Sequence, residues 1–253
     1  MLGNIATRLR VESGDGALIG GFIITGTQSK KVIIRAIGPS LALADKLTDP
    51  TLELRDLSGA LLDENDDWKL SANRQAIIDS GLAPTHDLES AVIATLPGNG
   101  SQYTAIVRGV NNGTGTAVVQ VYDLDTSGNS KLANIATRGF VQTGDNVLFA
   151  GMIVVGQASQ KVIVRAIGPS LSIAGKMANP TLELRDGNGG LLEENDDWVS
   201  SPNKQAIIDS TVAPTNDLES AIVRTLSPAN YTAIVRGVND TTGIAVVEVY
   251  ALP

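Results

Sequence analysis

YTAIVRG at residues 103–109, followed by NNGTG at 111–115 and TAVVQVY at 116–122, is the stretch of sequence that decides the fold class. Both outer runs are rich in β-branched and apolar residues, and Asn and Gly fill the segment between them. Such runs, bounded by turn residues, are typical of β-strands. Further runs of the same kind lie at residues 2–11, 17–25, 32–37, 51–55 and 90–96.

The same stretch returns as YTAIVRG at 231–237, within a repeat that spans half of the chain. RAIGPSL at 35–41 recurs at 165–171. A repeat of this length is a whole domain and not a solenoid unit of about 20–50 residues. We therefore predict a first repeat at residues 1–125, a linker at 126–131 and a second repeat at 132–253.

About eight short strands per repeat, without long helices between them, predict an all-β protein. The expected architecture is two tandem antiparallel β-sandwich domains of a jelly-roll-like type, with a barrel as the alternative. Short helical turns are expected at 41–47 and 72–80. Period-two alternation predicts core positions in each repeat. These are Leu52, Leu54, Ile106 and Val118, and then Leu182, Leu184, Ile234 and Val246.

Charge and composition exclude several partner classes. The chain holds 19 Lys and Arg against 27 Asp and Glu, a net charge of −8, and nucleic-acid binding needs a basic face. No apolar run approaches the roughly 20 residues of a transmembrane helix, so we expect no membrane insertion. Without cysteine there is no disulfide framework. The first residues form no signal peptide, and we expect a mature form or a piece of a longer chain.

The sequence also argues against an enzyme. Its one histidine, His86, is matched by Asn216 in the second repeat, and cysteine is absent. A nucleophile activated by histidine is therefore impossible in the second repeat. Paired carboxylates could hydrolyse a glycoside, but acidic residues are too abundant here for that pattern to be specific.

Each repeat carries one acidic cluster, DENDD at 63–67 and EENDD at 193–197. Clustered carboxylates suit a hard cation such as Ca²⁺, although the spacing does not fit an EF-hand loop. A turn whose Asn and Asp side chains bond their own backbone explains the same residues, and both interpretations stay open. No other cofactor is indicated. The candidate metal ligands are Asp63, Asn65, Asp66, Asp67, Glu193, Asn195, Asp196 and Asp197, with Asp87, Glu89, Asp217 and Glu219 as additional candidates.

Trp68 and Trp198 directly follow these clusters. Aromatic residues make up only 4% of the chain, so we expect lids whose N–H groups are hydrogen-bonded, and not sugar-stacking platforms. Arg35 lies inside an apolar strand, and we expect it to pair with Glu53 or Glu89.

The order of motifs in each repeat resembles the bacterial pre-peptidase C-terminal domain. The resemblance rests on DPTLELRD at 49–56, GALL at 59–62, NDD at 65–67, ESA at 89–91 and YTAIV at 103–107. It implies a β-sandwich related to collagen-binding and carbohydrate-binding jelly rolls, some of which hold calcium. The preceding third of each repeat resembles a tandem module of large secreted bacterial proteins, which implies an extracellular or cell-surface location.

Two functions fit these observations. The first is a non-enzymatic extracellular structural protein whose copies associate head to tail into a fibre or surface layer. The second is an accessory module that binds glycan or matrix protein, with calcium involved. Association through end strands would use an unpaired strand edge. The candidate assembly residues are Asn4, Ile5, Thr7, Arg8, Val249 and Tyr250.

Overall fold

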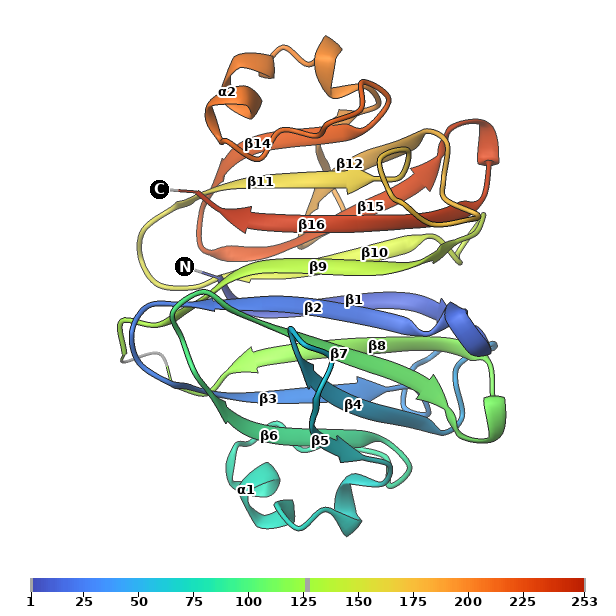
Figure 1. Cartoon of the computed structure of the whole chain (residues 1–253), viewed down its shortest axis with the longest axis vertical. Coiled ribbons are helices and arrows are strands. Elements are labelled where there is room, and N and C mark those ends of the chain that lie inside the picture. Colours follow the sequence, from blue (N-terminus) through green and yellow to red (C-terminus); the bar gives the residue numbers. More distant parts are fainter. Residues whose placement is uncertain (1, 126–127, 253) are drawn as a thin grey trace. The chain divides into compact units, whose positions relative to one another are not determined.

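The computed structural model describes residues 2–125 and 128–252 (Figure 1). The chain divides into two compact units at Ala133 and Asn134. Residues 126 and 127 of the predicted linker lie outside the described part. The last linker residue, Lys131, already begins a strand.

The first unit holds eight strands in two antiparallel sheets. The sheet orders are β1-β8-β3-β6 and β2-β7-β4-β5. The first strand therefore pairs with the eighth, the second with the seventh, the third with the sixth and the fourth with the fifth. This is the strand order of a jelly roll. The strands are β1 Leu2–Val11, β2 Leu18–Thr25, β3 Lys30–Ile37, β4 Pro50–Asp56, β5 Leu61–Asn65, β6 Ser90–Leu96, β7 Ser101–Gly109 and β8 Gly115–Asp123.

The second unit repeats this topology, with β9-β16-β11-β14 in one sheet and β10-β15-β12-β13 in the other. The predicted all-β fold of two tandem antiparallel sandwiches is therefore confirmed (Figure 1). The strands are β9 Lys131–Val141, β10 Leu148–Val154, β11 Gln160–Ile167, β12 Pro180–Asp186, β13 Leu191–Asn195, β14 Ser220–Leu226, β15 Ala229–Gly237 and β16 Gly243–Ala251.

Helical structure is confined to short segments between strands. The turn predicted at 72–80 is a helix, α1, and its copy is α2, whereas 41–47 contains bends, a turn and an isolated bridge from Lys46 to Thr116. Each α-helix packs against the edge strand that follows it, β6 or β14. The helices are α1 Arg74–Asp79 and α2 Lys204–Asp209, with 3₁₀ turns η1 Gly14–Gly16, η2 Trp68–Leu70, η3 Val110–Asn112, η4 Trp198–Ser200 and η5 Val238–Asp240.

Most of the predicted core is correct, but the inward face was wrong in three strands. Burial is confirmed at Leu52, Leu54, Leu182, Leu184 and Ile234. Half-buried instead are Ile106, Val118 and Val246. In β7 the neighbours Ala105 and Val107 are fully buried. Ile106, Val118 and Val246 share their faces with polar residues such as Arg108, Gln120 and Glu248, and those polar neighbours mark the outward face of each strand.

Strand β5 was not expected, and it changes the context of the acidic cluster. Asp63 and Asn65 were assigned to a turn or a metal loop, but they lie in this edge strand, opposite Leu54 and Leu52. Its two leucines are largely exposed, so the segment lacks the buried alternation that marks a strand. Only the last two residues of the cluster lie beyond the strand.

Candidate functional site

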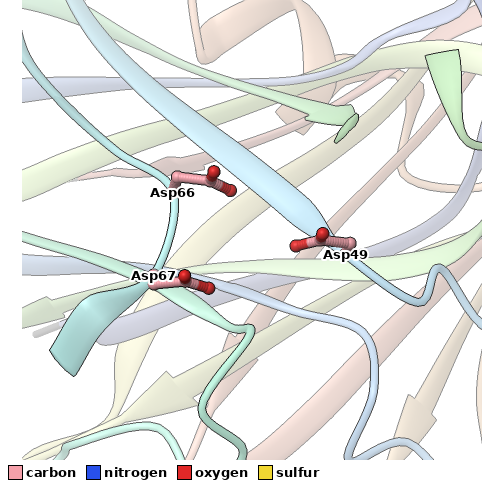
Figure 2. Close-up of side chains that lie close together, drawn as sticks. All are labelled: Asp49, Asp66 and Asp67. Atoms are coloured by element: carbon pink, nitrogen blue, oxygen red, sulfur yellow. The ribbon is translucent and has the colours of Figure 1, made fainter. Parts of the chain in front are cut away.

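The hairpin of β4 and β5 brings three aspartates together in the first repeat. Asp49 directly precedes β4, and Asp66 and Asp67 directly follow β5. Because the two strands are antiparallel neighbours, the start of one meets the end of the other. One carboxylate oxygen from each aspartate lies within 4.8 Å of those of the other two. Figure 2 shows the three side chains turned toward a shared space.

The electrostatics of this cluster favour a positive charge or a proton. Oδ1 of Asp49 and of Asp67 are buried without a hydrogen-bond partner among the described protein atoms. Burial, and then the charges of Asp66 and Asp67, raise the pKa of Asp49 above its ordinary value. Burial, and then the charge of Asp67, raise the pKa of Asp66. Facing carboxylates with unpaired oxygens disfavour full ionisation unless a cation joins them.

The second repeat has a neutral residue at one of these three positions, although burial and the charge of Asp197 still raise the pKa of Asp196. Asn179 occupies the position of Asp49. With its amide oriented to suit both neighbours, it donates to the carbonyl oxygen of Leu218 at 3.0 Å and to Oδ1 of Asp196 at 3.3 Å. A neutral donor thus replaces the third carboxylate. Oδ1 of Asp197 has no hydrogen-bond partner among the residues that the structure describes, and the same holds for Oδ1 of Asp67 in the first repeat.

The predicted ligand set therefore separates into two groups. Asp66 and Asp67 face the shared space, and Asp49 completes the group (Figure 2). Asn65 instead bonds the backbone of its own repeat, which we call the framework. Its Oδ1 accepts from the Ala91 amide at 2.9 Å, and its Nδ2 donates to the carbonyl oxygen of Asp67 at 3.1 Å. Asn195 makes the same two bonds in the second repeat. Asp63 accepts from the amide of the next residue, and Glu193 accepts from Arg224.

Of the additional candidates, Glu89 is part of the framework. It is fully buried, and its carboxylate accepts from the amides of Gly38 (3.3 Å), Ser40 (3.0 Å) and His86 (3.2 Å) and from the Ser40 hydroxyl (2.5 Å). A Cβ at position 38 would lie 2.2 Å from the carbonyl oxygen of Leu47, which explains the glycine. Glu219 makes the equivalent bonds to Gly168, Ser170 and Asn216.

Asp87, by contrast, pairs with Lys69 at the surface, at 2.5 Å. It is therefore engaged away from the aspartate cluster. Its pKa is lowered, first by the hydrogen bond from Lys69.

Trp68 is the lid that the sequence predicts. Its side chain is buried, and Nε1 donates to the carbonyl oxygen of His86 at 3.0 Å. Trp198 is half-buried and donates to the carbonyl oxygen of Asn216 at 3.1 Å. Nδ1 of His86 accepts from the Leu88 amide, a contact that Oδ1 of Asn216 copies. His86 therefore has a turn-forming role that asparagine can fill.

The expected partners of Arg35 were wrong. Arg35 donates to Oε1 of Gln120, to the carbonyl oxygen of Leu82 at 2.7 Å and to the hydroxyl of Tyr122 at 3.1 Å. Its copy, Arg165, forms an ion pair with Glu248. The partner thus lies on the neighbouring strand in both repeats, and it is a carboxylate only in the second.

The predicted assembly residues lie in strands paired within their own repeats. Val249 and Tyr250 sit in β16, which pairs with β11 on one side and β9 on the other. A central strand of this kind has no free edge for an added strand. Asn4, Thr7 and Arg8 belong to β1 and pair with β8. The side chain of Ile5 lies outside the described part.

Comparisons with known proteins add little to this picture. No family model matches the chain, and no curated protein matches it. A chain from a structure of Sulfolobus Turreted Icosahedral Virus aligns with 98% of this chain and 91% of its own, at 12% identity and a TM-score of 0.26. An Arthrobacter globiformis T6 isomalto-dextranase aligns with 95% of this chain and 36% of its own, at 13% identity and a TM-score of 0.23.

A DUF4785 family protein from Legionella pneumophila aligns over 97% of this chain and 64% of its own, at 12% identity and a TM-score of 0.27.

Within the described residues, no helix has the length and apolar character required to cross a membrane.

Proposed function

We propose that this protein is a non-enzymatic tandem jelly-roll module of the extracellular type, in which the first repeat binds Ca²⁺ and serves binding to a glycan or protein partner. The observation that carries the proposal is the difference between Asp49 and Asn179 in otherwise matching surroundings. Three polar side chains that both repeats share, Glu89, Asn65 and Trp68, are engaged in hydrogen bonds that hold the fold. The difference between repeats therefore points to a specialised site in the first.

The chemistry of the three aspartates suits calcium better than a softer metal. Oxygen-only ligands select hard cations, and Ca²⁺ accepts irregular geometry and completes its shell with water. Asp66 is exposed at the edge of a groove of about 610 Å³, which gives solvent access. A site of three carboxylates with open positions fits the weak affinity of extracellular modules, about 10⁻⁴–10⁻³ M.

Calcium is expected to raise the melting temperature of the first repeat, because a ligand that binds only the folded state stabilises it. At a concentration 100 times the dissociation constant the gain is about 2.7 kcal/mol. Asp49→Asn copies the second repeat and should abolish this gain. Calorimetric melts with and without calcium measure the effect. Asn179→Asp, the reverse exchange, should create a second calcium-dependent transition.

In EDTA, Asp49→Asn should change the melting temperature of the first repeat in the opposite direction. A carboxyl whose pKa is raised on folding contributes stability at acid pH, and this contribution is lost as the pH rises through the folded pKa. In EDTA at neutral pH, Asp49→Asn should therefore melt above the wild type, and the difference should vanish below about pH 4. A calcium-independent melt of the wild type would refute the metal site.

Head-to-tail self-association is a second candidate, favoured by exposed apolar side chains beside the short helices. Leu70 is 81% exposed, and Ile78 and Leu88 are also exposed; Ile208 and Leu218 are exposed in the second repeat. Large exposed apolar groups gathered at one place are typical of protein contacts.

If these side chains join copies of the chain, light scattering should show a mass that rises with protein concentration. Leu70→Ser, which introduces the residue found at position 200, should lower that mass without changing the melting temperature. Lys69→Val, which copies the neighbouring position 199, is the matched control. A constant monomeric mass at all concentrations would exclude this candidate. Deleting residues 1–11 is a poor test, because β1 contributes the fully buried Leu9 and Val11.

A further inference from the structure

The first repeat has a groove of about 760 Å³ on the open side of its sandwich, between edge strands β5 and β6. Ala94 and Leu96 of β6 line it on one side, and Leu62 and Asp63 of β5 line it on the other. Leu57, from the turn between β4 and β5, stands at its rim and is 73% exposed. The groove therefore combines apolar side chains with one carboxylate from β5.

The second repeat closes this place with an arginine of its own. Arg224 of β14 stands where the first repeat has Ala94. Its Nη1 donates to the carbonyl oxygen of Leu192 at 3.0 Å and to Oε2 of Glu193 at 3.3 Å. Arg224 thereby bridges the two edge strands β13 and β14. Leu192 and Glu193 correspond to Leu62 and Asp63, so the first repeat keeps both acceptor positions but lacks the arginine.

Two further differences open the same place in the first repeat. The position of Leu57 is held by Gly187, where a Cβ would lie 3.3 Å from the carbonyl oxygen of Asn230. The turn at residues 97–102, which contributes to the groove lining, is two residues longer than its copy. The absence of the arginine leaves space beside Ala94, the leucine adds an apolar side chain at the rim, and the longer turn contributes further lining residues.

We propose that this groove binds an extended segment of a partner protein through one arginine flanked by apolar residues. The guanidinium takes the place that Arg224 fills in the second repeat and donates to the Leu62 carbonyl and the Asp63 carboxylate. The alkyl stem lies over Ala94, and apolar neighbours contact Leu57. Arginine suits this place better than lysine because its planar fork donates to two acceptors at once.

Two properties of the chain support this occupant. Its net charge of −8 attracts a cationic segment. Both walls of the groove are edge strands, which accept an extended peptide by main-chain hydrogen bonding. The inference deepens the proposed binding function by naming a protein partner, but it does not use the calcium site.

The test is calorimetric titration of the full chain, in EDTA, with the capped heptapeptide SAIVRTL, the sequence of residues 220–226. One peptide should bind per chain. Replacing its arginine with citrulline, a neutral isostere, should weaken binding at least about tenfold. Ala94→Arg should abolish binding by filling the groove as the second repeat does, whereas Ala94→Ser should leave it unchanged.

A second pair of variants covers the case in which Ala94→Arg fails to fold. Asp63→Asn should weaken binding about tenfold, and Glu64→Gln, on the other face of β5, should not. The absence of saturable binding, equal binding of the citrulline peptide, or wild-type binding by Asp63→Asn would each overturn the proposal. Because calcium is absent throughout, failure of the calcium prediction leaves this result unaffected.

Discussion

Trp68→Ala is expected to lower the free energy of unfolding of the first repeat by about 3–5 kcal/mol. The Trp68 side chain is only 6% exposed and packs in a cluster with Ile33, Ile77 and Ala91. Removing the ring leaves a cavity between α1 and the sheet, and the carbonyl oxygen of His86 loses its donor. Urea denaturation followed by circular dichroism measures the loss.

The second repeat supplies the matched control for this prediction. Trp198 makes the same hydrogen bond but is only partly buried against its cluster. Trp198→Ala should therefore destabilise its repeat by less, about 2–3 kcal/mol. A sugar-stacking platform would behave differently, because truncation would then abolish glycan binding with the stability unchanged. Unaltered unfolding of Trp68→Ala would contradict the lid interpretation.

The fold was predictable because most strands in this chain are runs rich in β-branched and apolar residues that end at turn residues. Residues 90–96 were predicted as a strand and form β6 with those bounds. The inward face of β7 was predicted wrongly at Ile106, although its same-face neighbours Thr104 and Arg108 are polar and mark that face as outward. Strand β5 was missed because its leucines are exposed.

The aspartate site was predictable only in part. Asp66 and Asp67 stand in an obvious acidic cluster, but Asp49 lies far from it in sequence and meets it only through the pairing of β4 with β5. A signal was available, because position 49 changes from Asp to Asn between the repeats directly before a stretch, PTLELRD, that is identical in both. Comparing repeats at strand ends would have singled it out. The same comparison identifies the exchange of Ala94 and Arg224.

Glu89→Ala should destabilise the first repeat strongly, by about 3–5 kcal/mol. Its carboxylate is fully buried and is the shared acceptor for the amides of Gly38, Ser40 and His86. Removing it leaves several buried donors without partners, at about 1–3 kcal/mol for each one that water cannot reach. Differential scanning calorimetry should show the first repeat melting far below the second.

Glu89→Gln separates the role of charge from that of shape. Glutamine keeps one acceptor oxygen but turns its NH₂ group toward backbone donors, so we expect a smaller loss of about 1–3 kcal/mol. Glu219→Ala should reproduce the alanine effect in the second repeat, because Glu219 is also fully buried and has the same contacts. A Glu89 with a metal-binding role would instead respond to calcium. Equal destabilisation of Glu89→Ala with and without calcium would therefore confirm that this carboxylate holds the loop after β3 and not a cation.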